Sequence, residues 1–364
     1  MPVTPQITGG MAAFCARARE AIDAAERILL AGHIFPEADS VGSQAALARH
    51  LAARGKRVAV RNPTPVQEPY RFLQALGGIP DAAWSHGTQP LPAHDLIVLL
   101  DVSDWDYMGA LGGLLQASGV PKIVFDHHQS SPPAGTIGLI DPHASATGEV
   151  LYRYFLATGA RIDSAMAAAL YASILFDTGG FRFRCTRDET LLIAAELIRR
   201  GARHRELAAE LFENQSWPRI ELLTAALQRL SDESDGRLAW TYVTREMFAE
   251  TRTTAVDADG ITDHLMAIRG VELAALFREL EGRGVKVTLR SKGKPAVGPL
   301  AEAWGGGGRP TAAGFTLRTT LKGAIADVLP SLRELLTAPG ATAAAAAGSE
   351  AGLGAGEGEQ DGTG

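Results

Sequence analysis

An uninterrupted apolar run, Leu96 to Leu100, constrains the fold more than any other feature of this sequence. A strand that is apolar at every position is typical of a parallel sheet with both faces covered by helices. A second apolar run, Ile123 to Phe125, follows a segment near Gly109 to Leu115 that we expect to be helical. Strands that alternate with helices in this way predict an α/β domain built on a parallel sheet.

The sequence around these two strands continues the alternation. Further strands are predicted over 27–32, 56–60 and 136–140, and helices over 12–26, 45–54 and 69–76. Asp39 or Ser40 precedes the helix of 45–54, and we expect one of them to cap it. Helices then dominate from about 148 to 230.

Strands return after Gly236, over 238–243, 271–277 and 285–290, and indicate a second, smaller α/β domain with a mixed sheet. We therefore predict a first domain over 1–185, a helical connector over 186–235 and a second domain over 236–336. The remaining segment, 337–364, contains mostly Ala, Gly and acids and is expected to be disordered.

The charge of the chain limits its partners. The formal net charge is −6, and four acids without a Lys or Arg lie in the segment 337–364, so the remainder carries about −2. Binding to long duplex DNA requires many neutralised phosphates, which makes this chain a poor candidate for that function. Short phosphorylated ligands remain compatible with it.

Three observations favour a cytoplasmic protein. No apolar stretch reaches the roughly 18 residues of a membrane span, and the first residues lack the basic and apolar regions of a signal peptide. Cys15 and Cys185 are far apart and form no Cys-x-x-Cys pair. We therefore expect no disulfide framework and no thiolate metal cage.

Four separate segments place acids or imidazoles at predicted loops, three of them directly after a strand. They contain His33 with Glu37 and Asp39, Asp101, Asp126 with His127 and His128, and Asp177. Parallel strands bring their carboxyl ends to one edge of the sheet, so these groups should converge. Clustered carboxylates repel one another unless a cation is bound. Carboxylates and imidazoles without thiolates favour manganese or a similar divalent ion.

Each of these residues also has an ordinary structural explanation when taken singly. Asp39 could be a helix cap, His33 a satisfied loop histidine and Asp101 a turn residue. Together, their positions after buried strands of one domain favour a metal site. Two ions about 3.5 to 4 Å apart are a common solution for phosphoester hydrolysis.

The same residues carry a family resemblance. His33-x-x-Pro36-Glu37-x-Asp39, Leu100 to Asp104, Asp126-His127-His128 and Asp177 to Phe181 resemble the four motifs of the DHH phosphoesterases. Leu289-Arg290-Ser291, followed by the segment 305–314, is similar to the nucleotide-binding motif of the DHH-associated C-terminal domain. The resemblance spans about residues 15 to 335. Chain length favours the nanoRNase and pAp-phosphatase branch, the NrnA type.

The resemblance implies a set of metal ligands. It implies two Mn²⁺ ions, with Mg²⁺ or Co²⁺ as substitutes. One ion would be held by His33, Glu37 and Asp101, and the other by Asp39, Asp101, His127 and Asp177. A water between the ions would attack phosphorus in line. Asp126 would orient an imidazole, and His128 would bind the phosphate or assist the leaving oxygen.

The second domain is expected to recognise the substrate. The resemblance implies a phosphate site formed by Arg290, Ser291, Gly306, Gly307, Gly308 and Arg309. The alternative for the glycine run is a flexible linker. Two positions depart from the family pattern, which has Asp at the position of Glu37 and His at that of Arg309. Arg309 could still bind phosphate, whereas Glu37 is one methylene longer than the acid it replaces.

The function implied is hydrolysis of short oligoribonucleotides and of the 3′-phosphate of pAp-like nucleotides. Two alternatives stay open at this point. One is hydrolysis of cyclic or linear dinucleotides such as c-di-AMP or pApA, and the other is a nucleotide-binding regulator without turnover. The sequence does not give the oligomeric state, although the apolar helices of residues 148–230 could supply the surface of a homodimer.

Overall fold

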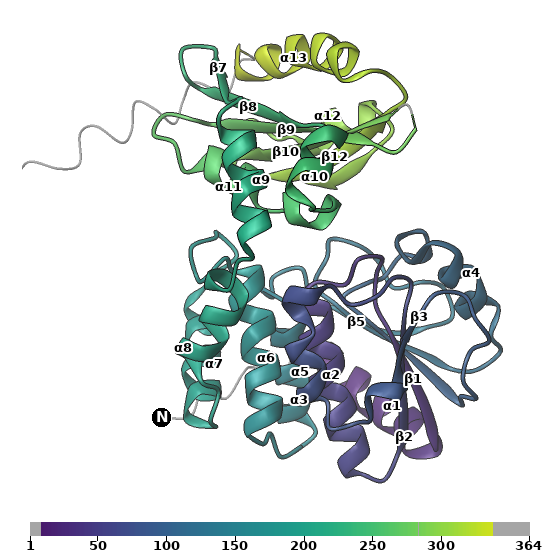
Figure 1. Cartoon of the computed structure of the whole chain (residues 1–364). Helices are drawn as coiled ribbons and strands as arrows, with labels where there is room; N and C mark the ends of the chain where they lie inside the picture. The colour runs from purple at the N-terminus through teal and green to yellow at the C-terminus, as the bar shows by residue number, and fades with distance from the viewer. Residues whose placement is uncertain (1–8, 283, 338–364) are drawn as a thin grey trace, which may run out of the picture. The chain divides into compact units, whose positions relative to one another are not determined.

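The computed structural model describes residues 9–282 and 284–337 (Figure 1). The chain divides into two compact units, Met1–Asn214 and Gln215–Gly364. The segment 337–364, for which disorder is predicted, lies outside the described residues except for Thr337.

The first unit is built on a parallel sheet of six strands. In chain order they are β1 (Arg27–Ala31), β2 (Arg57–Asn62), β3 (Trp84–His86), β4 (Leu96–Leu100), β5 (Lys122–Asp126) and β6 (Ile137–Ile140). Their spatial order is β3-β2-β1-β4-β5-β6, and each neighbouring pair is parallel. The chain therefore reverses its direction of growth between β1 and β4. In open α/β sheets, ligands bind at such a switch point, beyond the carboxyl ends of the strands.

Helices cover both faces of this sheet, as predicted. On one face, α1 (Gly9–Ala24), α2 (Ala38–Ala53), α5 (Thr147–Ala157) and α6 (Ser164–Asp177) pack on Ile28 and Leu30. On the other face, α4 (Gly109–Ala117) packs on Leu29 and Ile97. Successive strand residues thus enter different cores, which explains why every residue of β4 is apolar and buried.

Shorter helices complete the first unit. They are η1 (Glu68–Tyr70), α3 (Phe72–Leu76), η2 (Asp81–Ala83), η3 (Trp105–Met108), α7 (Asp188–Arg199), α8 (His204–Ala208) and the π-helical turn η4 (Ala209–Glu213). The short edge strand β3 was not predicted. It contains only three residues, too few for a periodic pattern.

The start of α2 corrects one prediction. The helix begins at Ala38, before both expected capping residues, and Glu37 occupies the capping position without a side-chain cap. Neither Asp39 nor Ser40 caps it, because both lie within its first turn. Asp39 is instead held by donors from α5 and α6.

The second unit contains a mixed sheet, as predicted. Its strands are β7 (Ser231–Glu233), β8 (Leu238–Val243), β9 (Leu273–Leu280), β10 (Gly284–Ser291), β11 (Gly307–Arg309) and β12 (Ala312–Leu317), in the order β11-β12-β10-β9-β8-β7. Strands β8 and β9 are parallel, and the other pairs are antiparallel.

One core of the second unit contains residues of α9 (Trp217–Leu227), α10 (Arg245–Thr251), η5 (Ala255–Ala258) and α11 (Ile261–Met266). The other contains residues of α12 (Gly298–Ala303) and α13 (Leu321–Thr337). Leu222 and Ala226 of α9 are fully buried in the first of these cores. Helix α9, predicted as part of a connector, is therefore part of this unit.

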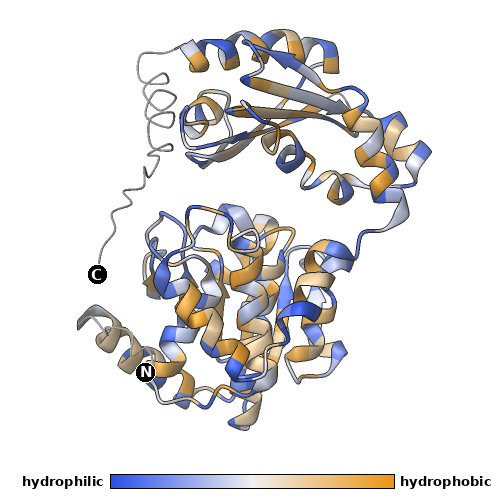
Figure 2. Ribbon diagram, turned by 90° about the vertical axis from the view of Figure 1, so that its left-hand side faces the viewer, coloured by the Kyte–Doolittle hydropathy of each residue, from blue (hydrophilic) through white to orange (hydrophobic). Residues whose placement is uncertain are grey.

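The helices of both units carry apolar and polar residues side by side (Figure 2). This mixture is expected of helices that cover a sheet on one side and face water on the other. Within residues 9–282 and 284–337, no helix is both long and apolar enough to cross a membrane.

His50 of α2 should make the first unit sensitive to acid. Burial, followed by the charge of Arg54, lowers the pKa of His50 to about 4, and its ring lies 5.0 Å from that of Phe155. The unfolded chain binds a proton at His50 below about pH 6.5, whereas the folded chain does not until about pH 4. Stability contributed by the neutral ring is therefore lost as pH falls from 6.5 towards 4.

We expect a His50→Gln variant to lose less stability than the unmodified protein between pH 7 and pH 5. The expected difference is roughly 1 to 2 kcal/mol, discounted for the partial exposure of the ring. Urea unfolding at both pH values measures it. His86→Gln, at an exposed histidine, is the control, and equal losses in all three proteins would contradict the role of His50.

Candidate metal centre

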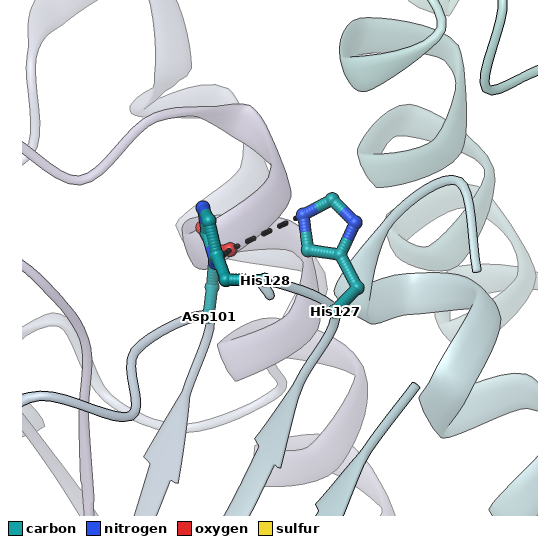
Figure 3. Close-up of side chains that lie close together, drawn as sticks. All are labelled: Asp101, His127 and His128. Atoms are coloured by element: carbon teal, nitrogen blue, oxygen red, sulfur yellow. Dashed lines mark ion pairs between the residues drawn. The ribbon is translucent and has the colours of Figure 1, made fainter. Parts of the chain in front are cut away.

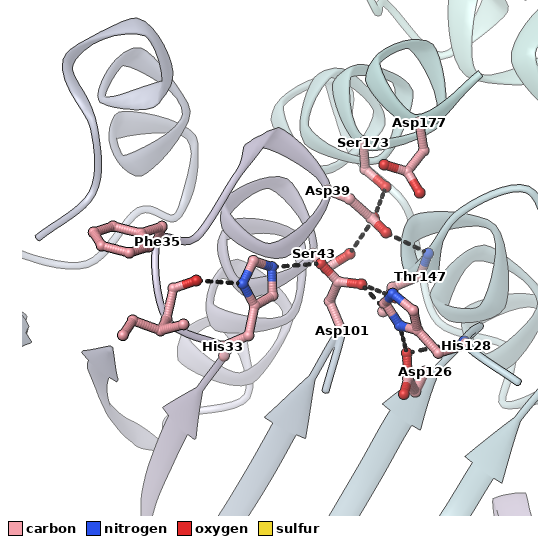
Figure 4. Close-up of polar contacts among 12 residues, drawn as sticks. His33, Phe35, Asp39, Ser43, Asp101, Asp126, His128, Thr147, Ser173 and Asp177 are labelled. Carbon is pink, nitrogen blue, oxygen red and sulfur yellow. Dashed lines mark hydrogen bonds and ion pairs between the residues drawn. The ribbon is translucent and has the colours of Figure 1, made fainter. Parts of the chain in front are cut away.

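Seven side chains converge at the carboxyl edge of the first sheet, beside the switch point between β1 and β4 (Figure 4). They come from the loops after β1, β4 and β5, from the end of β5, from the first turn of α2 and from the last residue of α6. They are His33, Asp39, Asp101, Asp126, His127, His128 and Asp177. The sequence predicted this convergence, although it could not give the contacts within it.

Two groups within this cluster have ligand atoms close enough to share an ion. Asp101, His127 and His128 form one group (Figure 3), and Asp39, His127 and Asp177 form the other. Within each group the ligand atoms lie within 4.8 Å of one another. His127 belongs to both groups, so the two sets are adjacent.

Asp101 lies between the two sides of the cluster. Its Oδ2 is 3.2 Å from Nε2 of His33, and its Oδ1 is 3.7 Å from Nε2 of His127. Burial alone would raise the pKa of Asp101, but the hydrogen bond and charge of His33 lower it well below its ordinary value. The residue has a φ of +61°, in the left-handed region that few residues other than Gly, Asn and Asp adopt. This backbone directs the carboxylate towards both imidazoles.

Asp39 is held by the start of α5. Its Oδ2 accepts a hydrogen bond from Thr147 N at 2.9 Å, and its Oδ1 accepts one from Gly148 N at 3.2 Å and another from Ser173 Oγ. A Cβ at Gly148 would lie 2.1 Å from Ser173 Oγ, so the close approach requires glycine. Burial, and then the charges of Asp101 and Asp177, raise the pKa of Asp39 to about 7.

The rings of His33 and His127 have the same arrangement. Nδ1 of His33 lies 2.7 Å from Ile34 O, and Nδ1 of His127 lies 3.3 Å from Ala144 O. A Nδ1–H donated to a carbonyl leaves Nε2 as the ligand atom. Burial alone would lower both pKa values, but Asp101 raises that of His33 to about 9 and Asp177 raises that of His127 to about 10.

Asp126 contacts the second histidine of its motif. Its Oδ1 accepts hydrogen bonds from His127 N at 2.7 Å, from His128 N at 3.2 Å and from Nδ1 of His128 at 2.7 Å. Asp126 is fully buried, whereas the side chain of His128 is 39% exposed. This geometry fixes the ring of His128 at the solvent side of the cluster.

Asp177 and Glu37 differ in how closely they join the cluster. Oδ2 of Asp177 lies 3.1 Å from Nε2 of His127. Glu37 is exposed and, among the described residues, belongs to neither ligand group. Its charge helps to raise the pKa of His33. The structure therefore brings Asp177 into contact with its predicted neighbours and leaves Glu37 at the periphery.

The chemistry of these donors fits a divalent cation. Carboxylate oxygens and imidazole nitrogens surround a small volume, and burial, followed by repulsion from two other carboxylates, raises the pKa of Asp39. A divalent ion relieves such repulsion. Sulfur enters neither ligand group, and Cys185 Sγ instead donates to Asp177 O at 3.5 Å. Hard oxygen and imidazole ligands suit Mn²⁺, Mg²⁺ or Co²⁺.

The sequence analysis missed the residues that hold the ligands in place. Thr147 donates through Oγ1 to Asp101 at 3.3 Å and through N to Asp39, while Ser173 donates to Asp39. A hydroxyl within a helix, as at Ser173, gives no signal of its own in the sequence. Near Thr147 the sequence predicted only the beginning of a helical region, at about residue 148.

Glu149 anchors the loop that carries these donors. Its Oε2 accepts hydrogen bonds from Ser145 N at 3.2 Å, Ser145 Oγ at 2.6 Å and Thr190 Oγ1 at 2.9 Å. Its Oε1 pairs with Arg153 and Arg187. The carboxylate is fully buried. It thereby fixes the loop whose Ala144 O and Thr147 contact the cluster.

A Glu149→Gln variant should bind Mn²⁺ about 10- to 100-fold more weakly, which is the usual effect of losing a group that orients ligands. The amide removes the negative charge and turns an N–H donor towards an arginine or a hydroxyl. Calorimetric titration measures the affinity. Glu189→Gln is the control, because Glu189 also pairs with Arg153, at 3.0 Å, but is partly exposed. Equal Mn²⁺ affinities in the two variants would contradict an orienting role.

The predicted phosphate site of the second unit lies on three adjacent strands. Arg290 of β10 and Arg309 of β11 both stand opposite Ala312 of β12. Residues in register project from the same face of a sheet, so the two arginines flank a small residue. Ser291 ends β10, and its N donates to Thr311 O at 2.9 Å.

The glycines of this region have a packing role. A Cβ at Gly306 would lie 2.2 Å from Gly314 O, and one at Gly308 would lie 2.5 Å from Ala312 O. Both glycines therefore permit close approach to β12. Gly307 to Arg309 form strand β11, so this part of the run is not the flexible linker of the alternative interpretation.

Comparison with known proteins agrees with the resemblance. The model of the DHH family N-terminal domain matches residues 27–174, and that of the DHHA1 domain matches residues 236–338. The chain is 31% identical to the bifunctional oligoribonuclease and PAP phosphatase NrnA of Thermus thermophilus, over 86% of this chain and 91% of that protein. It is 28% identical to the Bacillus subtilis protein of the same name, over 80% and 90%.

A solved structure has the same fold. An exopolyphosphatase-related protein from Bacteroides fragilis superimposes with a TM-score of 0.82 and 23% identity, covering 90% of this chain and 98% of that one. At this level of identity the likeness supports the fold alone.

Proposed function

Since the chain belongs to the DHH family of phosphoesterases and carries a DHHA1 domain, we propose that it hydrolyses short oligoribonucleotides and the 3′-phosphate of pAp-like nucleotides. The observation that carries this proposal is the convergence of His33, Asp101 and His127, together with Asp39 and Asp177, at one edge of the sheet. The NrnA relatives are named for both activities.

The proposed ligand assignment follows the two sides of the cluster. Asp39, His127 and Asp177 would hold one divalent cation, and His33 would hold a second, with Asp101 shared between them. Divalent cations supply Lewis acidity that lowers the pKa of a bound water and offsets phosphate charge. Manganese is our proposed ion because the donor set combines imidazole with carboxylate. Glu37 is the weakest member of this proposal, because it is exposed, whereas Nε2 of His33 lies 3.2 Å from Asp101.

Two neighbouring residues would complete the chemistry. Asp126 holds Nδ1 of His128, which leaves Nε2 of that ring available to the phosphate or to the leaving oxygen. A histidine in this position can donate a proton as the bond to the leaving group breaks. In the second unit, Arg290, Ser291, Arg309 and the glycines 306 to 308 would bind a terminal phosphate, for which arginine offers paired donors.

The decisive experiment incubates the purified full chain with Mn²⁺ and, separately, pAp, short RNA of two to five nucleotides and c-di-AMP. We expect phosphate release from pAp and mononucleotides from RNA, and no product when a chelator is added. Faster hydrolysis of c-di-AMP than of either would replace this proposal with the dinucleotide alternative. Tight nucleotide binding without any product would favour a regulator.

We also propose a cytoplasmic location and a homodimer. Cys15 and Cys185 form no disulfide, which suits a reducing compartment. Exposed Leu191, Leu192 and Ile198 of α7 lie within the helical region that was predicted to supply the dimer surface. Sedimentation of the purified chain measures the oligomeric state.

A further inference from the structure

Three large apolar side chains are exposed beside the candidate metal centre. Ile34 is 39% exposed, Phe35 is 53% exposed and Tyr107 is 58% exposed. Ile34 N donates to Tyr107 O at 2.8 Å, which joins the loop after β1 to the helix η3 after β4. We call these three residues the apolar patch. It lies across the switch point of the sheet, where α/β folds bind ligands.

Phe35 has a backbone conformation that residues with bulky side chains rarely adopt. Its φ is +56°, in the left-handed region where a bulky residue is a genuine outlier. Two hydrogen bonds hold the turn, one from Phe35 N to the side-chain Oγ1 of Thr64 at 2.8 Å and one from Ile34 N to Tyr107 O. Because the ring is exposed, its burial stabilises the fold little and does not offset this strain. A strained conformation that stabilises the fold so little points to a functional role.

Phe35 lies close to the cluster, where the base of a bound substrate could reach it. Nδ1 of His33 is hydrogen-bonded to Ile34 O, so the patch begins at the residue next to a proposed metal ligand. The ring of Phe35 lies on the side of His33 that faces away from Asp101 (Figure 4). A substrate whose phosphorus lies at the cluster would extend its sugar and base over neighbouring loops. Aromatic side chains at such a place bind bases of any sequence by stacking.

We propose that Phe35, together with Tyr107 on the segment hydrogen-bonded to its loop, forms a stacking surface for a nucleobase of the substrate. This inference rests on the proposed function, because it assumes that a nucleotide phosphate binds at the cluster. It adds a base-recognition site on the first unit. It also gives the enzyme a contact that tolerates different bases, as a hydrolase of short RNA requires.

The test separates the base from the phosphates. A Phe35→Asn variant removes the ring and keeps a residue that adopts the left-handed conformation readily. With pAp as substrate we expect KM to rise about 5- to 100-fold, the range for loss of one stacked base, with kcat little changed. With ribose 3,5-bisphosphate, which has the same phosphates and no base, KM should not change. Thermal unfolding should show a Tm that is unchanged or higher.

Two further variants sharpen the comparison. Tyr107→Leu should raise KM for pAp by a smaller factor, because an apolar surface remains. Leu114→Asn changes a side chain of α4 that is 43% exposed, and it should affect neither substrate. Equal changes for pAp and the base-free compound, or no change for either, would overturn the inference. So would a Phe35→Asn variant that alters only the sedimentation of the protein, since the patch would then be a contact between copies.

Equilibrium binding keeps this inference separate from the proposed function. If the unmodified chain releases no product from pAp or RNA, the proposed function fails. The affinities of the unmodified chain and the Phe35→Asn variant for AMP and for ribose 5-phosphate, measured by calorimetry, then still test the patch. Weaker binding of AMP alone by the Phe35→Asn variant supports the stacking surface, and unchanged binding of AMP refutes it.

Discussion

Replacing Asp101 by asparagine should lower kcat for pAp and short RNA by about 10³-fold or more. Asp101 contacts both His33 and His127, so it is the residue on which both halves of the cluster depend. The substitution removes one negative charge and keeps nearly the same shape. Asparagine also tolerates the φ of +61° at this position, so the fold should survive. Steady-state turnover in Mn²⁺ measures kcat, and circular dichroism measures whether the variant is folded.

Asp104→Asn is the matched control for this experiment. Asp104 is exposed, lies three residues further along the same loop, and accepts a hydrogen bond from Asp106 N at 3.0 Å. Its loss should affect turnover less than about threefold, as expected for an ordinary surface position. A folded Asp101→Asn variant with near-normal turnover would show that the cluster does not hold the catalytic ions.

Alanine at His127 and at His128 should give different results, although the two residues are adjacent. Nε2 of His127 is buried and lies 3.1 Å from Asp177 and 3.5 Å from Asp39. Its removal deprives both ligand groups of a donor, so Mn²⁺ binding should weaken and turnover should fall by about 10³-fold or more. Calorimetry with Mn²⁺ and turnover of pAp measure the two effects.

His128→Ala should weaken Mn²⁺ binding much less than His127→Ala, because Nδ1 of His128, the ring atom nearer Asp101, is already bonded to Asp126. It should lose about 10²-fold in kcat, the lower range for loss of general acid catalysis. Asp126 would still accept hydrogen bonds from His127 N and His128 N, so the buried carboxylate keeps partners. If His128→Ala turned over like the unmodified chain while His127→Ala did not, the proposed proton-transfer role of His128 would be wrong.

The sequence predicted the architecture of the cluster because strand ends are visible in it. Leu96 to Leu100 and Ile123 to Phe125 are apolar runs that stop at acids or imidazoles, and parallel strands must align these ends. The mixed second sheet was also recognisable from its central strands. Strands β11 and β12 were not, because glycine and alanine carry little strand signal.

The contacts within the cluster depend on packing that no local pattern reveals. Asp39 was expected to cap a helix, but donors from α5 and α6, distant in sequence, hold it. Glu37 stands at a ligand position of the family motif, as Glu in place of Asp, and it occupies the exposed position before α2. The backbone conformations of Phe35 and Asp101 were equally hidden, because only the surrounding hydrogen bonds impose them.

The candidate ligands come from widely separated parts of one unit, from His33 to Asp177. A bound ion would therefore cross-link the ends of a long chain segment, much as a disulfide does in secreted proteins. Any ligand that binds only the folded state raises its stability with the logarithm of the ligand concentration. Under the proposed ligand assignment, removal of the divalent ion by a chelator would therefore lower the free energy of unfolding of this unit as well as its rate of turnover.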